Sequence, residues 1–220
     1  MLYFDKMEET TSREKILKKI RNALINKTDK PAIPVDYESN IYLTTDESLD
    51  LVFAKEFTNI AGKFVYCQNE NEFIAILRSL ISEKKWENIF CIDEVLKSFL
   101  KHGGISFTCN EADFKNMEVG ITRCEYLIAR LGSAMVSSKQ ASGRRLNIFP
   151  ESHIILAYSS QLVPDIKHAL KNIRKKYEDD FPSLVSIISG PSRTADIEKT
   201  LVMGAHGPKN LYVFLIDDSY

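Results

Sequence analysis

The sequence predicts an α/β fold: a Rossmann-like, mostly parallel sheet with helices on both faces, preceded by an N-terminal helical extension. Short apolar runs alternate with amphipathic segments from about residue 41 onward, which is the pattern of such a sheet. The composition, 44% hydrophobic and 27% charged, is typical of globular proteins, and 220 residues are enough to bury a sizeable core. We expect residues 1–40 to form an appendage and residues 41–220 to form one α/β domain.

The appendage is predicted to contain one amphipathic helix. REKILKKIRNALI carries an apolar stripe at helical spacing, and Thr11-Ser12 before it can cap the helix. TDKPAIPVDYESN, which follows, contains Pro31 and Pro34 and has no periodicity, so it is predicted to be an extended linker. The stripe needs a partner surface, on the main domain or on another subunit. Its residues are Ile16, Ile20, Ala23 and Leu24.

The first half of the α/β domain has a regular alternation of elements. Helices are predicted over residues 46–60, 71–85 and 93–101, the first closed by Gly62 and the last by Gly103-Gly104. The apolar runs KFVYC, NIFCI and ISFTC are predicted to be strands.

After Gly120 the pattern becomes less regular. We expect a helix over residues 122–130, a strand at AMVSS, a polar loop at KQASGRR and a strand at HIILAY. PDIKHALKNIRKKY has strong helical spacing and opens with Pro164. SLVSIIS is predicted to be a strand, residues 195–203 a short helix, and LYVFLI the closing strand.

Charge and hydropathy exclude several classes of protein. The net charge is −1, so no strong field attracts nucleic acid or an anionic membrane surface. The longest unbroken apolar run, residues 211–216, is far shorter than the ~20 residues of a membrane span. The N-terminus has acidic residues where a signal peptide has an apolar stretch. We therefore expect a cytoplasmic protein with neither nucleic acid nor membrane as a partner.

The four cysteines do not have the spacing of a metal site. Cys67, Cys91, Cys109 and Cys124 lie far apart, without C-x-x-C or a Cys/His pair at ligand spacing. Three of them fall in or at the end of the strand-like runs KFVYC, NIFCI and ISFTC, which favours reduced, core-facing residues. We expect no metal ion or iron–sulfur cluster on this chain.

The common cofactor and nucleophile motifs do not occur. The sequence contains no G-x-G-x-x-G after a strand, no G-x-x-x-x-G-K-[ST], no G-x-S-x-G and no H-E-x-x-H. The sheet architecture alone assigns no chemistry.

The stretch SGPSRTADIEKTLVMGAHGP, residues 189–208, is the strongest candidate site. It is predicted to be a strand end, a Gly-Pro turn, a helix start and a returning loop, and backbone N–H groups at a helix N-terminus bind anions. Alternatively, Ser192 or Thr194 only caps the helix, and Asp196 favours its dipole. The candidate ligand-binding residues of this stretch are Gly190, Ser192, Arg193, Thr194, Asp196 and Gly207.

Further candidates precede this stretch. A guanidinium group suits a carboxylate or phosphate, so Arg123, Arg144 and Arg145 are expected to complete the anion site, unless they form surface ion pairs. Gly132 and Ser133, between a predicted helix and a strand, are also candidate ligand-binding residues.

His206 is the candidate catalytic residue. It lies between Ala205 and Gly207, where the backbone can turn, and could serve as an acid–base group or an anion donor. Alternatively it bonds a backbone carbonyl and holds the loop. His153, at the entrance of a strand, is interpreted as structural, and His102 and His168 as solvent-facing helix residues.

The segments GIT-x-C-E, LGS, GRR, FPESHI, SGPSRTADIE and GAHGP, in this order, resemble the lactate-utilisation (LUD) domain, specifically its lactate utilisation protein C branch. The likeness covers roughly residues 45–217, and its most specific part is SGPSRTADIE followed by GAHGP. The resemblance implies a fold related to the superfamily of sugar-phosphate isomerases, CoA-transferases and formyltetrahydrofolate cyclo-ligase. It also implies oxidation of L-lactate to pyruvate alongside two partner proteins that carry iron–sulfur clusters.

One departure from the family pattern is visible. Arg130-Leu131 stands before Gly132, where the family usually has an acidic residue and Thr, so any chemistry of that acidic group is altered here. The first hypothesis is a cluster-free component of lactate utilisation that binds a small carboxylate or phosphate-bearing ligand. A homo-oligomer is compatible with this hypothesis. The alternatives are an assembly or regulatory subunit without its own active site, and a nucleotide-dependent ligase or transferase resembling the cyclo-ligase.

Overall fold

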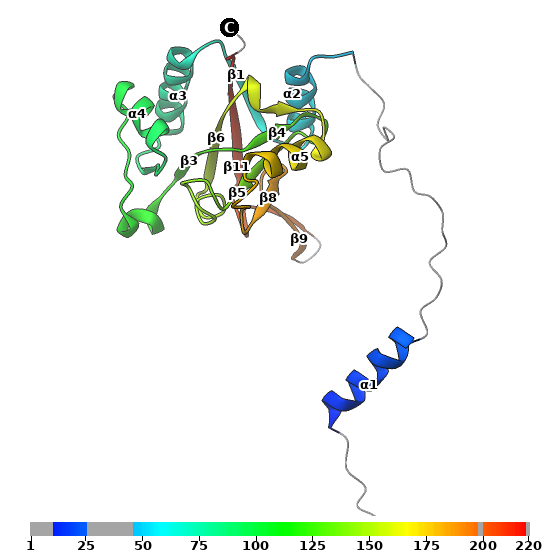
Figure 1. Ribbon diagram of the computed structural model, residues 1–220. Helices are drawn as coiled ribbons and strands as arrows, with labels where there is room; N and C mark the ends of the chain where they lie inside the picture. Colours follow the sequence, from blue (N-terminus) through cyan, green and yellow to red (C-terminus); the bar gives the residue numbers. More distant parts are fainter. Residues whose placement is uncertain (1–10, 26–45, 198–199, 219–220) are drawn as a thin grey trace, which may run out of the picture. The chain divides into compact units, whose positions relative to one another are not determined.

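The computed structural model describes residues 11–25, 46–197 and 200–218 (Figure 1). Within these ranges, the side chains of residues 195–201 are not described. The chain divides into two units, Met1–Thr44 and Thr45–Tyr220, and each is described by itself. The predicted linker, residues 28–40, lies outside the described residues.

The N-terminal unit contains the predicted amphipathic helix, α1 (Ser12–Ile25). Thr11 caps it reciprocally: the Glu14 N–H donates to the Thr11 hydroxyl (3.3 Å), and the Thr11 N–H donates to the Glu14 carboxylate (2.9 Å). The helix buries none of its side chains, and the apolar stripe remains exposed, with Ile20 at 50% and Leu24 at 60%.

A parallel sheet of five strands forms the centre of the second unit (Figure 1). The strand order is β1-β11-β6-β3-β2, and every neighbouring pair is parallel, which confirms the predicted sheet. Its members are β1 (Lys63–Cys67), β2 (Ile89–Phe90), β3 (Val119–Arg123), β6 (Ser152–Tyr158) and β11 (Asn210–Ile216).

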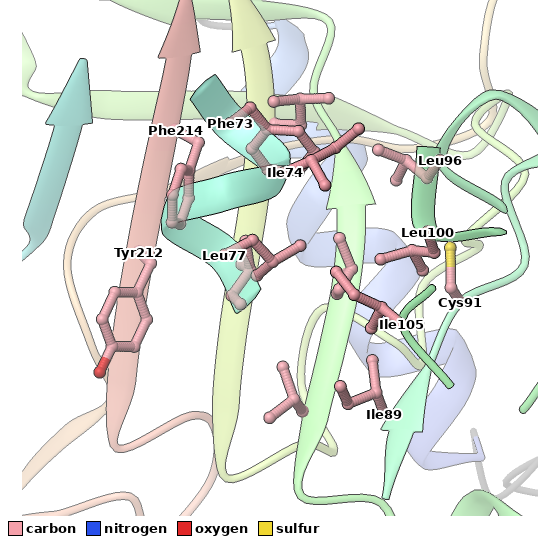
Figure 2. Close-up of a cluster of buried hydrophobic side chains, with 14 of the residues drawn as sticks. Phe73, Ile74, Leu77, Ile89, Cys91, Leu96, Leu100, Ile105, Tyr212 and Phe214 are labelled. Atoms are coloured by element: carbon pink, nitrogen blue, oxygen red, sulfur yellow. The ribbon is translucent and has the colours of Figure 1, made fainter. Parts of the chain in front are cut away.

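Two helices cover one face of this sheet, α3 (Glu70–Lys84) and α4 (Glu94–His102). Figure 2 shows how Phe73 and Leu77 of α3 point at Phe214 and its neighbours on the sheet, while Leu96 and Leu100 of α4 complete the cluster. Side-chain caps fix where the helices begin, since Asn69 accepts from the Glu72 N–H and Asp93 accepts from the Val95 N–H.

The other face is covered by α2 (Leu49–Asn59) together with a second sheet of order β7-β4-β5-β8. Phe53 and Phe57 of α2 are fully buried in this core. Helix α5 (Ile166–Lys176) packs on the second sheet through Ala169 and Ile173. The strands of the second sheet are β4 (Tyr126–Ile128), β5 (Ser133–Ser137), β7 (Leu162–Val163) and β8 (Val185–Ile188).

Two predicted elements in the middle of the chain are wrong. Residues 122–130 are not a helix: they complete β3, form β4 and end in a short 3-10 helix, Ala129–Leu131. Arg123 and Glu125 interrupt the apolar residues of GITRCEYLIA, and the short apolar run YLIA that remains fits a strand as well as a helix. ISFTC is not a strand, because only a single bridge joins its Thr108 to Phe90. Two further 3-10 helices are present: Glu111–Asn116 lies between α4 and β3, and Ser159–Gln161 follows β6.

The third correction concerns the candidate stretch. Residues 195–203, predicted to be helical, belong to an antiparallel hairpin of β9 (Arg193–Ile197) and β10 (Thr200–Met203), in which Met203 lies opposite Arg193. The stretch is rich in β-branched residues, and a helix of this length gains little from propagation, so strand pairing prevails. The chain therefore has no helix N-terminus after the Gly-Pro turn.

Candidate functional site

The two loops of the candidate stretch lie side by side. The Ser192 N–H donates to the Pro208 carbonyl (2.8 Å), and the Gly204 N–H donates to the Ser192 carbonyl (2.9 Å). The Lys209 N–H donates to the carbonyl of Glu151, directly before β6 (2.8 Å). Because β6 and β11 begin at these residues, both loops lie at the amino edge of the central sheet.

A hollow of about 420 Å³ opens between these segments, and we call it the GAHGP hollow. An apolar wall comes from the loop before β6, and a polar wall of backbone and charged groups comes from the loop before β11. Its lining residues are Met117, Ile148, Phe149, Pro150, Glu151, Gly204, Ala205, His206, Gly207 and Lys209. The combination suits a small organic anion with an apolar part.

Three titratable side chains line the GAHGP hollow. The Lys209 ammonium lies 3.0 Å from the Glu151 carboxylate, and both groups are exposed. His206 is exposed and belongs to the loop whose Gly204 has a φ of +76°. A side chain at Gly204 would overlap the Lys209 stem, so glycine permits this close approach. The geometry leaves Lys209 and His206 accessible to an incoming anion.

Gly190 and Arg193 hold the end of α2 rather than the hollow. The Arg193 guanidinium donates to the Ile60 carbonyl (2.6 Å), directly after the helix. Gly190, with φ +73°, packs so closely that an added Cβ would lie 2.5 Å from the same oxygen. Thr194 is half-buried on β9, and the side chain of Asp196 lies outside the described residues.

Gly132 and Ser133 lie close to the C-terminal end of α2 and to Ser189, directly after β8. Gly132 packs against the backbone of Phe57 in α2. The buried Ser133 hydroxyl donates to the Leu131 carbonyl (2.8 Å) and lies 2.8 Å from the Ser189 hydroxyl. The Ser133 contact joins the start of β5 to the residue that follows β8, and neither Gly132 nor Ser133 lines the GAHGP hollow.

Arg144 and Arg145 diverge in the loop between β5 and β6. Arg144 donates to the Ser183 hydroxyl (3.0 Å). Arg145 lies 4.2 Å from the Phe114 ring centre and 5.7 Å from that of Phe149, which lines the GAHGP hollow. Of these two arginines, Arg145 is the one in contact with a wall of the hollow.

Arg123 lies at the opposite edge of the sheet. It ends β3, where the strands have their carboxyl ends, and it pairs with the buried Asp93 carboxylate at 2.7 Å. The same Asp93 caps α4, so the pair joins a strand end to a helix start. The structure therefore does not bring Arg123 together with the GAHGP hollow.

His153 is fully buried on β6. Its Nε2 lies 2.8 Å from the Thr122 hydroxyl, and burial lowers the pKa of the imidazole to about 3. Within the described part of the chain its Nδ1 has no hydrogen-bond partner. This environment fits the structural role expected for His153. His168 is exposed beside Asp165, at 2.9 Å, and His102 is an exposed residue at the end of α4.

Sequence reasoning missed the role of Glu125. Its side chain, 1% exposed, accepts from the Ser137 hydroxyl (2.6 Å), the Lys176 ammonium (2.7 Å) and the Tyr177 hydroxyl (3.0 Å). The carboxylate thereby joins β4, β5 and α5. An acid inside the apolar run CEYLIA was the available signal, because a buried charge requires partners. Glu151, Phe149 and Lys209 were likewise not singled out as site residues.

The cysteines are all reduced, and three are buried: Cys67, Cys91 and Cys124. Burial raises the pKa of each of these thiols to about 12, so they remain protonated. The expectation that Cys109 faces the core is wrong, since ISFTC forms no strand and this thiol is exposed. In the ranges that the structure describes, no group of His, Cys, Asp or Glu has the geometry to hold a metal ion.

None of the described helices has the length and apolar character needed to cross a membrane.

Comparison with known proteins identifies the fold and the family. The LUD domain model matches residues 51–216. "Lactate utilization protein C 1" from Bacillus mycoides is 35% identical over 106 residues, 47% of this chain and 45% of that protein. "Lactate utilization protein C" from Shouchella clausii is 34% identical over 130 residues, 56% of this chain and 57% of that one. The matches thus span about half the length of these relatives.

Two further matches extend over most of the chain. An uncharacterized protein from Neisseria meningitidis serogroup B is 26% identical over 221 residues and 94% of each chain. The crystal structure of a DUF162 family protein from Deinococcus radiodurans covers 76% of this chain and 96% of that one, with 12% identity and a TM-score of 0.55. This structural likeness supports the fold.

Proposed function

This chain belongs to the LUD domain family, and from this premise we propose that it is a component of L-lactate utilisation. In this role it takes part in oxidising L-lactate to pyruvate together with partner proteins that carry iron–sulfur clusters. It carries no cluster itself and binds a small carboxylate or phosphate-bearing ligand. The observation that carries the proposal is the similarity to two proteins named lactate utilization protein C, at 34–35% identity.

The chemistry of the GAHGP hollow supports a small organic anion as the ligand. Lys209 supplies a charge-assisted donor and His206 an imidazole N–H, and Phe149 with Ile148 supplies an apolar wall for a carbon chain. The glycines of the loop let its backbone approach the ligand, and backbone hydrogen bonds to Ser192 hold the loop in place. His206 is proposed to donate or shuttle a proton at this site.

The test is the thermal stability of the purified full-length protein with lactate, pyruvate, an acyl-CoA or a nucleotide. A ligand at a hundred times its Kd stabilises the folded state by about 2.7 kcal/mol, which raises the melting temperature measurably. Lys209→Ala and His206→Ala should reduce the shift. Lys171→Ala, an exposed lysine on α5, is the matched control. A wild-type melting temperature unchanged by every one of these compounds would remove the ligand-binding part of the proposal.

The partner proteins are tested separately. Adjacent reading frames rich in cluster-binding cysteines are expected, and their products should co-purify with this chain while it remains colourless on its own. Co-purification without any ligand-induced shift would favour the second candidate, an assembly subunit. The specific observation in favour of that role is α1, whose side chains are all unburied within their own unit. If the neighbouring genes encode folate enzymes instead, the cyclo-ligase-like alternative is favoured.

A further inference from the structure

A second hollow, of about 340 Å³, lies at the amino edge of the sheet. We call it the Trp86 pocket. It shares Glu151 with the GAHGP hollow but is otherwise built from different residues. Of these residues, only Glu151 and Ser152 belong to a segment of the family resemblance, FPESHI. Its lining residues are Lys63, Lys84, Trp86, Glu118, Glu151, Ser152, Asn210 and Tyr212.

The chain fixes Trp86 firmly at the mouth of this pocket. Helix α3 ends at Lys84, Lys85 takes a left-handed φ of 57°, and the Trp86 N–H donates back to the Ile81 carbonyl (3.2 Å). The indole then packs edge-to-face on the Tyr212 ring, with 5.9 Å between the ring centres.

Hydrogen bonds also hold the two residues that follow Trp86. One oxygen of the Glu118 carboxylate accepts from both the Glu87 and the Asn88 N–H, at 2.8 Å each. Tyr212 is 4% exposed and lies on β11 among the core residues of Figure 2. The aromatic wall of the pocket is therefore positioned without any ligand.

Lys63 is the central charge of the pocket. Its ammonium donates to the Asn210 side-chain oxygen (2.8 Å) and to the Tyr212 hydroxyl (3.1 Å), and lies 4.7 Å from the centre of the Tyr212 ring. Both acceptors are neutral, and in the described ranges Lys63 forms no ion pair. A lysine ammonium has three N–H donors, so one is left for a ligand.

The other charges of the pocket already have partners. Glu118 is bonded to two backbone N–H groups, Glu151 pairs with Lys209 (3.0 Å), and Lys84 lies 2.7 Å from Glu83 outside the lining. The carboxylates that line the pocket are thus engaged, while Lys63 is held by neutral groups alone. This arrangement favours an anion next to Lys63.

We propose that the Trp86 pocket binds an anionic group carried on a flat ring, with Lys63 contacting the anion and the indole of Trp86 contacting the ring. The volume falls in the range of small-molecule sites and exceeds what a bare phosphate needs. Aromatic carboxylates and nucleoside monophosphates share this chemistry. The pocket is distinct from the proposed lactate site and does not depend on it.

Trp86 is the single tryptophan of the sequence, so the intrinsic tryptophan fluorescence of the full-length protein reports on this pocket directly. We expect a saturable change in emission on titration with adenosine monophosphate or with benzoate, and the stronger of the two identifies the source of the anion. Inorganic phosphate should bind more weakly than adenosine monophosphate, because it lacks the ring. Sodium chloride at matched ionic strength should leave the emission unchanged.

Lys63→Met should reduce the affinity measured by the fluorescence titration roughly tenfold or more, since it removes a charge-assisted hydrogen bond to the anion. Lys101→Met, an exposed lysine on α4, is the matched control and should respond like the wild type. Tyr212→Phe, which keeps the ring and removes one acceptor from Lys63, is the second variant should Lys63→Met fail to fold. An emission that no probe changes saturably, or an equal response from Lys63→Met and Lys101→Met, overturns the proposal.

The two sites can fail independently. Lys63→Met should leave any melting-temperature rise with lactate or pyruvate intact, and His206→Ala should leave the fluorescence response intact.

Discussion

Replacing Glu125 with alanine should lower the free energy of unfolding by about 2–4 kcal/mol. The substitution removes three hydrogen bonds from a carboxylate that is 1% exposed. Each neutral hydrogen bond contributes about 1 kcal/mol and a charged one about 1.5–3 kcal/mol. Two effects reduce the sum: the folded state no longer desolvates a carboxylate, and the Lys176 ammonium, 49% exposed, regains water.

The measurement is urea unfolding followed by circular dichroism at neutral pH, with wild type, Glu125→Ala and Glu178→Ala compared. Glu178 is an exposed acid just after α5, so its substitution should cost less than about 0.5 kcal/mol. A double-mutant cycle with Glu125→Gln and Lys176→Met isolates the charged pair. We expect the glutamine substitution to cost less when Lys176 is already methionine. If Glu125→Ala unfolds at the same urea concentration as Glu178→Ala, the carboxylate is not a structural clamp.

The ion pair of Lys176 with Glu125 also predicts that the stability of the fold depends on pH in the alkaline range. Burial lowers the pKa of Lys176, but the hydrogen bond and the charge of Glu125 outweigh it, so the pKa in the folded state is raised above 10.5. A group whose folded pKa is raised contributes stability that is complete below its unfolded pKa. This contribution is therefore constant at neutral pH and is lost as the pH rises above about 10.5. Glu125→Ala should remove that part of the alkaline loss.

Four further outcomes are expected. Because burial lowers the pKa of His153 from 6.5 to about 3, stability should fall as the pH drops through that interval, and His153→Gln should flatten the slope of unfolding free energy against pH. Arg193→Ala should cost about 1 kcal/mol of stability through the lost bond to Ile60 and leave ligand-induced melting shifts unchanged; a weakened shift would instead assign Arg193 to the ligand. His206→Asn should weaken binding of a small carboxylate, because it removes the imidazole that lines the GAHGP hollow, as isothermal titration calorimetry can measure. Deleting residues 1–30 should leave the α/β domain folded by circular dichroism but reduce self-association or partner capture; identical behaviour in both assays would make α1 a mere tail.

The sequence predicted the central sheet because buried parallel strands are continuous apolar runs. KFVYC, HIILAY and LYVFLI became β1, β6 and β11, and the amphipathic segments between them became helices. The same logic failed at residues 122–130, where an apolar run fits either state. It also failed at β9 and β10, since the pairing of Met203 with Arg193 is not a local property of either segment.

The candidate site was predictable only where residues are close in sequence or share a motif. The segments SGPSR and GAHGP are separated by only a few residues, and in the structure they are hydrogen-bonded to each other. The Trp86 pocket combines Lys63, Trp86 and Tyr212 from three distant parts of the chain, and none of them carries a motif. Its assembly depends on the register that places Lys63 opposite Tyr212. Register between strands is tertiary information.

The register also decides which arginines can share a small ligand with the GAHGP loop. Ser152 of β6 pairs with Asn210, directly after that loop, whereas Arg123 pairs with Leu156 farther along β6. With a rise of about 3.3 Å per residue, these two levels are about 13 Å apart along the strands. A three-carbon acid is much shorter than this distance and cannot contact both. An anion of lactate size held by His206 and Lys209 is therefore beyond the reach of Arg123, and Arg123→Ala should leave its affinity unchanged. A weakened affinity would place the small anion at the carboxyl edge of the sheet, beside Asp93.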